Sequence, residues 1–139
     1  MMNMKIKSLI IHNLLLTKSV DKGEIILRAN TLKKHIIEQN FYSTGPTLYT
    51  YNKEEGYRVG ATVNTSVILE NYNILSFYEK IELSKCIYAR VFGENMDNVY
   101  QQMYEYANKN NLKVIDNTFY HVLLDVYGEV ITDVYLQVE

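Results

Sequence analysis

The sequence of 139 residues has little of several residue types, and some of these shortages exclude a class of protein. It holds one cysteine, Cys86, so no disulfide can form within the chain, and we expect a reducing, cytoplasmic location. It also has one proline and no tryptophan. No apolar run approaches the roughly 20 residues that cross a bilayer, and the apolar start lacks the cleavage site of a secretory signal. We therefore expect no membrane insertion.

The numbers of basic and acidic residues are also nearly equal. The chain has 14 Lys and Arg residues against 16 Asp and Glu residues, which gives a formal net charge of −2. The two signs are interspersed, whereas a nucleic-acid-binding protein gathers basic residues on one face. The sequence therefore predicts no nucleic-acid partner.

Motifs for metal binding and catalysis are equally scarce. His12, His35 and His121 lack the short ligand spacing of a zinc site, so no metal is predicted. Cys86 could pair with His12 or His121 as nucleophile and base, but no other motif accompanies it, and its place within an expected strand favours packing as a small apolar residue. The glycines form no phosphate-binding loop. We expect no enzymatic activity and no cofactor.

The sequence does have regular alternation of strand and helix patterns. In the first half, about residues 5–68, the expected order is strand, helix, strand, strand. These elements cover residues 5–16, 21–40, 47–51 and 57–68. Asp21 is expected to cap the helix, with Glu24 three residues later. Gly60 falls inside a strand and predicts a bulge or a close backbone approach.

The second half, about residues 81–138, repeats this order after a connector at 69–80. Its expected elements cover residues 81–92, 95–108, 117–126 and 131–138. The connector is unusually apolar and is interpreted as a short helix or a flap. The pattern predicts one α+β domain over 1–139, in which two βαββ repeats form a mostly antiparallel sheet with both helices on one side. The uncovered face, or the cleft between the halves, is then left to bind another molecule.

One group of residues near the last hairpin suggests a ligand cleft. A carboxylate that faces an aromatic cleft can bind a cation. The residues expected to line such a cleft are Tyr49, Tyr51, Tyr88, Tyr120, Asp125, Asp133 and Tyr135. The alternative is that the charges are solvated at turns and that the tyrosines pack across strands.

Three segments resemble a known fold. The segment GPTLYTY at 45–51, the strand and helix at 87–114 and the closing ITDVYLQV at 131–138 resemble the GyrI-like effector-binding fold, also called SOUL-like. The resemblance implies a domain that binds a small molecule. The closing strand of that family usually carries a Glu and a Pro; here Asp133 stands near the Glu position, and the Pro is absent.

A closer resemblance involves TGPTLYTYN, CIYARVFGE, YANKNNLKV and FYHVLL. These segments are similar to the EsaE-like family of cytosolic chaperones, encoded in type VII secretion loci of Gram-positive bacteria. The resemblance implies a non-enzymatic adaptor that binds a secreted toxin and presents it to the secretion machinery, with the secretion ATPase as a further partner. This is the primary functional hypothesis, and a stand-alone small-molecule-binding domain is the alternative.

The apolar connector and two tyrosines of the second helix form the expected client surface. An exposed apolar segment often marks a partner site, and tyrosine is enriched at interfaces. The residues expected to contact the client are Tyr72, Ile74, Leu75, Phe77, Tyr78, Tyr104 and Tyr106. The alternative is that the connector folds over the sheet as part of the core.

Overall fold

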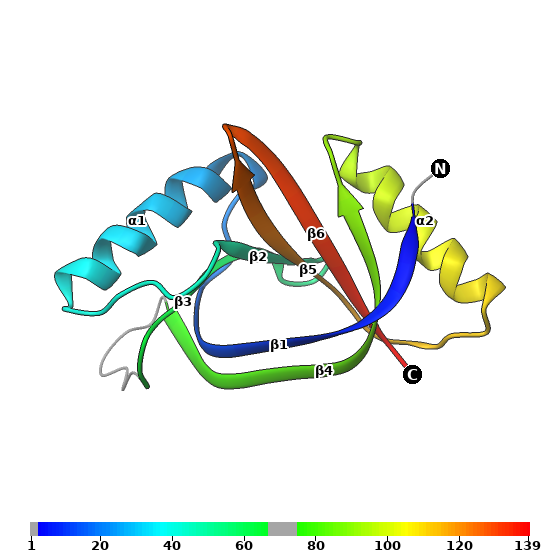
Figure 1. The fold of residues 1–139 in the computed structure, drawn as a ribbon, viewed down its shortest axis with the longest axis horizontal. Helices are drawn as coiled ribbons and strands as arrows, with labels where there is room; N and C mark the ends of the chain where they lie inside the picture. Colours follow the sequence, from blue (N-terminus) through cyan, green and yellow to red (C-terminus); the bar gives the residue numbers. More distant parts are fainter. Residues whose placement is uncertain (1–2, 67–74) are drawn as a thin grey trace.

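The computed structural model describes residues 3–66 and 75–139 (Figure 1). These residues form the order strand, helix, strand, strand twice. The elements are β1 (Met4–Thr17), the short 3₁₀ helix η1 (Lys22–Glu24), α1 (Ile25–Glu38), β2 (Leu48–Asn52), β3 (Gly56–Thr62), β4 (Leu75–Val91), α2 (Met96–Lys109), β5 (Val114–Val126) and β6 (Glu129–Val138). The predicted pair of βαββ repeats is confirmed.

The strands form one antiparallel sheet in the order β1-β3-β2-β5-β6-β4, which closes because β4 pairs with β1. Each half supplies three adjacent strands. The halves meet at two seams, one between β2 and β5 and one between β1 and β4. The second seam is long and runs from Met4 opposite Ala89 to Thr17 opposite Leu75. The two halves are therefore hydrogen-bonded to each other at both edges of their three-stranded portions.

Side-chain alternation along the strands shows that both helices cover the same face of the sheet. On β6, Val134 and Leu136 pack in a cluster with α2, whereas Tyr135 between them belongs to the cluster on the other face. On β1, Leu15 packs with α1, whereas Leu14 and Leu16 join Tyr135 on that other face. The helices lie toward opposite ends of the molecule (Figure 1). This arrangement confirms the predicted sheet with its helices on one side.

The face opposite the helices is mostly core. Strands β1 and β4 curve strongly (Figure 1), and Leu9 and Leu14 of β1 pack with Leu48 of β2 and with Leu83 and Cys86 of β4. These side chains come from both halves and fill the inside of the closed sheet. The broad uncovered face expected from the sequence is therefore largely occupied by the chain itself.

The helix ends follow the expected chemistry in the second half only. Asn95 caps α2, because its Oδ1 accepts from the backbone N–H groups of Asp97 and Asn98 at 3.0 and 3.4 Å. Asp21 does not cap α1, because η1 intervenes and the Asp21 side chain makes no capping hydrogen bond. The expected capping box is wrong, and Glu24 lies 3.6 Å from Arg28 instead.

The connector is also different from expectation. Residues 75–80, interpreted as part of a short helix or a flap, begin strand β4 and pair with the end of β1, Phe77 opposite Leu15. Residues 67–74 lie outside the described part of the chain. Because Leu14–Leu16 offer a long apolar strand as a partner, pairing extends β4 well before residue 81.

Gly60 shows the close backbone approach that its position predicted, and this gives the first testable expectation. A Cβ at this position would lie 2.9 Å from Leu16 Cδ2 and 3.0 Å from the carbonyl oxygen of Leu15. Gly60→Ala should therefore lower the free energy of unfolding by about 1 kcal/mol in urea denaturation, since a crowded core accepts an added methyl at a cost. Gly23→Ala is the control, because nothing lies within 4 Å of its Cβ position. Equal stability of the two variants would contradict this account of Gly60.

Candidate functional site

A groove of about 790 Å³ lies between helix α2, the turn that joins β2 to β3, and the start of β5. We call it the α2 groove. Its lining residues are Tyr51, Asn52, Lys53, Glu54, Asp97, Tyr100, Gln101, Tyr104, Glu105, Asn108, Ile115, Asp116, Asn117 and Phe119. Its volume falls within the usual range of roughly 300 to 1,000 Å³ for small-molecule sites.

Four aromatic rings form a continuous wall of the α2 groove. The rings of Tyr51 and Tyr100 are stacked with centroids 5.6 Å apart, and those of Tyr100 and Phe119 are stacked at 4.0 Å. The ring of Tyr104 meets Phe119 edge to face at 5.6 Å, and its hydroxyl donates to Asn117 Oδ1 at 2.9 Å. Burial raises the pKa of both Tyr100 and Tyr104, so these phenols stay neutral. The groove thus offers rigid, uncharged ring surfaces.

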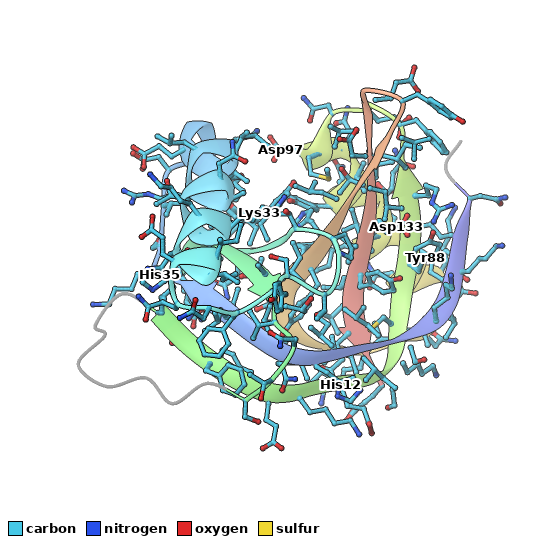
Figure 2. All side chains as sticks on the ribbon, turned by 60° about the vertical axis from the view of Figure 1, so that its left-hand side comes forward. His12, Lys33, His35, Tyr88, Asp97 and Asp133 are labelled. Atoms are coloured by element: carbon cyan, nitrogen blue, oxygen red, sulfur yellow. The ribbon has the colours of Figure 1, made fainter. Side chains whose placement is uncertain are left out.

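The charges of the α2 groove are mostly negative. Its lining carries four carboxylates, from Glu54, Asp97, Glu105 and Asp116, and one ammonium group, from Lys53. None of these carboxylates forms an ion pair with another part of the chain described by the structure. Figure 2 labels Asp97 at the beginning of α2. A cation that enters the groove would therefore meet an excess of negative charge, because one ammonium group stands against four carboxylates.

A buried histidine holds the ring wall in place. The Tyr100 hydroxyl lies 2.6 Å from His121 Nε2, and His121 Nδ1 lies 3.0 Å from the Tyr49 carbonyl oxygen. Because a carbonyl can only accept, the Nδ1–H donates to Tyr49, and Nε2 accepts from Tyr100. Burial lowers the pKa of His121 to about 3, so the ring is neutral. No sequence motif predicted this role of His121, although a histidine within the apolar segment FYHVLL was a signal for it.

A second polar cluster lies on the other face of the sheet. Asp133 Oδ1 accepts from the Tyr88 hydroxyl at 3.0 Å, and Arg90 donates to both carboxylate oxygens at 2.7 and 2.9 Å. Burial, then the hydrogen bond to Asp133, raises the pKa of Tyr88 to about 12. Lys7 Nζ lies 4.3 Å from the centre of the Tyr88 ring. Tyr88 and Asp133 are both labelled in Figure 2. Asp133 is thus already paired with a cation of the chain.

The seven residues expected to line one cleft are divided between the two faces. Tyr88, Tyr120, Asp133 and Tyr135 gather on the face opposite the helices, where the rings of Tyr88 and Tyr135 are 5.1 Å apart. Tyr49 and Tyr51 lie on the helix-covered face, and Tyr51 belongs to the α2 groove. Asp125 is exposed on β5 near the hairpin. These seven residues therefore include one ring of the groove, Tyr51, but none of its four carboxylates.

The residues expected to bind a client protein are also dispersed. Tyr72 and Ile74 lie outside the described residues. Leu75 and Phe77 are half-buried against the α1 cluster, and Tyr78 is 37% exposed. Tyr104 and Tyr106 of the expected client surface are both half-buried against the α2 cluster. Of these residues, Tyr104 contributes to the α2 groove, and client binding by the set stays a prediction.

The arrangement of Cys86 does not suit a nucleophile. The thiol is buried on the face opposite His121, and burial raises its pKa to about 11. Both ring nitrogens of His121 are already bonded to Tyr49 and Tyr100. Within residues 3–66 and 75–139, no group of three His, Cys, Asp or Glu side chains is placed to hold a metal ion. The same residues contain no helix whose length and apolar character suit a membrane span.

Solved structures define the class of fold. The C-terminal domain of EcmrR has a TM-score of 0.72 and 14% identity over 100% of this chain and 98% of that domain. EcmrR in a complex with DNA has a TM-score of 0.74 and 14% identity over 99% of this chain, which spans 57% of the EcmrR chain. A hydrolase from Listeria innocua has a TM-score of 0.56 and 9% identity, covering 97% and 92% of the two chains. At these identities the likeness establishes the fold alone, which is GyrI-like.

The chain belongs to the family DUF5085, described as a domain of unknown function, whose family model matches residues 11–139. Among curated proteins, no sequence matches this chain.

Proposed function

We propose that the chain is a non-catalytic binding domain whose α2 groove holds a small organic cation with an aromatic or apolar body. One observation carries the proposal: four aromatic rings and four carboxylates line one groove, and none of these carboxylates forms an ion pair within the described part of the chain. Electron-rich ring faces attract a cation, and the carboxylates add a charge that a neutral molecule could not use. The GyrI-like fold of effector-binding domains supports this reading.

The polar groups of the groove are arranged for binding rather than for bond breaking. Asp116 Oδ1 accepts from the Thr118 hydroxyl, which accepts in turn from the Asn52 amide at 3.0 Å. These bonds hold the carboxylate beside the ring wall. Tyr100 and Tyr104 remain protonated because burial raises the pKa of each. A preformed groove with fixed partners loses little conformational freedom on binding, which favours affinity.

The test compares two molecules of the same shape and opposite charge. Tetraphenylphosphonium should bind the protein in isothermal titration calorimetry and shift NMR amide signals of α2 and of residues 115–117, whereas tetraphenylborate should not shift them. The double variant Glu105→Gln/Asp116→Asn should weaken tetraphenylphosphonium binding by about fivefold, because partly exposed charges each contribute a fraction of a kcal/mol.

The matched control is Glu79→Gln/Asp125→Asn, which removes the same charge at exposed positions outside the groove. It should bind tetraphenylphosphonium like the unmodified protein. Equal binding of the two ions, or equal loss in the two double variants, would count against the α2 groove as a cation site.

The toxin-chaperone hypothesis, with the secretion ATPase as a further partner, has no comparable group of residues behind it. Leu75 and Phe77 of the expected client surface pack against α1, and Tyr104 is part of the ring wall. The direct experiment is co-purification from the native host: recovery of a secreted toxin with this chain, reduced by Phe77→Ala/Tyr78→Ala in a folded protein, would favour the chaperone over the ligand-binding domain.

A further inference from the structure

A smaller pocket of about 300 Å³ lies at the other end of the molecule, between helix α1 and the residues that follow β1. It is separate from the α2 groove, since the two share no lining residue. Leu32 of α1, which is buried, and Leu75 at the start of β4 supply apolar surface. The pocket therefore has an apolar wall in addition to its polar rim.

The charge of this pocket is opposite to that of the α2 groove. Lys18 and Arg28 line it, and none of its described lining residues carries a carboxylate. The acidic partner of Arg28 is Glu24, four residues earlier at the end of η1, at 3.6 Å. Both side chains of that pair are about half exposed, so water screens their attraction. Arg28 can therefore turn to a stronger anionic partner at little cost.

The hydroxyl groups in the pocket wall are already engaged. The Thr17 hydroxyl donates to the Lys18 carbonyl and accepts from the Val59 N–H, and the Thr31 hydroxyl donates to the Leu27 carbonyl. These bonds fix the wall but leave the hydroxyls no proton to offer. The charged heads of Lys18 and Arg28 supply donors for a ligand, and such groups bind oxyanions strongly.

We infer that this pocket is a second binding site, which takes a small organic anion with a carboxylate held by Lys18 and Arg28 and an apolar chain against Leu32 and Leu75. The apolar wall separates such a ligand from an inorganic anion, which would gain nothing from it. The two basic side chains separate it from the cations expected in the α2 groove. The inference does not depend on that groove.

Three probes test the ligand chemistry by NMR. Octanoate should shift amide signals of residues 17–20 and 28–35. Acetate, which has the same head without the chain, should bind at least about tenfold more weakly, since burying several CH₂ groups contributes about 0.8 kcal/mol each when complete. Octylammonium, with the same chain and the opposite charge, should leave these signals unchanged. The inference would be overturned if acetate or octylammonium bound to this pocket as tightly as octanoate does.

Variants test the residues. Lys18→Ala/Arg28→Ala should weaken octanoate binding by about fivefold, whereas Lys33→Ala/Lys34→Ala, which removes the same charge from exposed positions outside the pocket, should not change it. Glu24→Gln, which removes the competing partner of Arg28, should strengthen octanoate binding by about twofold. If the two double variants bind octanoate equally, the site is not where we place it.

Discussion

The free energy of unfolding should fall by about 3 kcal/mol between pH 6.5 and pH 4 through His121 alone. Burial lowers the pKa of this imidazole from 6.5 to about 3 in the folded chain. Between these values the unfolded chain binds the proton and the folded chain does not, so stability rises with pH. The stabilisation is complete above about 6.5 and is lost as the pH falls toward 3. Urea denaturation at several pH values measures the slope.

The variant His121→Asn separates the contribution of His121 to the pH dependence of stability from the contribution of carboxylates that titrate in the same pH range. The asparagine amide keeps a donor for the Tyr49 carbonyl. The variant should be less stable than the unmodified chain at neutral pH, because the Tyr100 hydroxyl loses its acceptor. Its stability should nevertheless fall less between pH 6.5 and pH 4 than that of the unmodified chain. His12→Gln, at an exposed position, is the control and should keep the full loss. An NMR titration in which the His121 ring gains its proton near pH 6.5 would contradict the prediction without any variant.

Replacing Arg90 with alanine should lower the free energy of unfolding by about 2 kcal/mol at neutral pH. The side chain of Asp133 is only 9% exposed, so its carboxylate would remain desolvated with Tyr88 as its single partner. The cost is below that of a fully buried pair, because the Arg90 side chain is 47% exposed and water screens the interaction. Thermal or urea unfolding of the variant measures it.

The double variant Arg90→Ala/Asp133→Asn should recover most of this stability, because it removes the unpaired charge together with its partner. Arg28→Ala is the matched control for loss of an arginine from an exposed ion pair, and it should cost less than about 0.5 kcal/mol. An Arg90→Ala variant as stable as Arg28→Ala would mean that Asp133 is well solvated, contrary to its position in the structure.

The order of the elements could be predicted from the sequence because each element has a local period. Alternating residues such as Val59 and Ala61 mark a strand, and the steps between Ala29, Leu32 and Ile36 mark a helix. The start of β4 could not be predicted in this way. Residues 75–80 become a strand because the end of β1 pairs with them, and a partner about 60 residues away leaves no local signal.

The candidate site was only partly predictable for a similar reason. Alternation shows which residues of one strand share a face. The pairing register then decides which residues of the neighbouring strand lie on that same face. Tyr49 lies opposite His121, whereas Tyr120 lies opposite Thr50, so the two tyrosines point to different faces. The side of the groove that α2 forms did have a local signal. Asp97, Tyr104 and Asn108 recur at helical spacing on one face of α2.

The two seams between the halves have a consequence for how such a chain can arise and be divided. Each seam joins a strand to its counterpart in the other half, β1 with β4 and β2 with β5. This is the pattern of an isologous dimer, in which the same patch meets itself across a two-fold axis, here fused into one polypeptide. One half alone would expose two unpaired strand edges and the apolar side chains that it contributes to the shared core. A separate half could complete its sheet only by self-association, so a smaller version of this domain would have to be a homodimer.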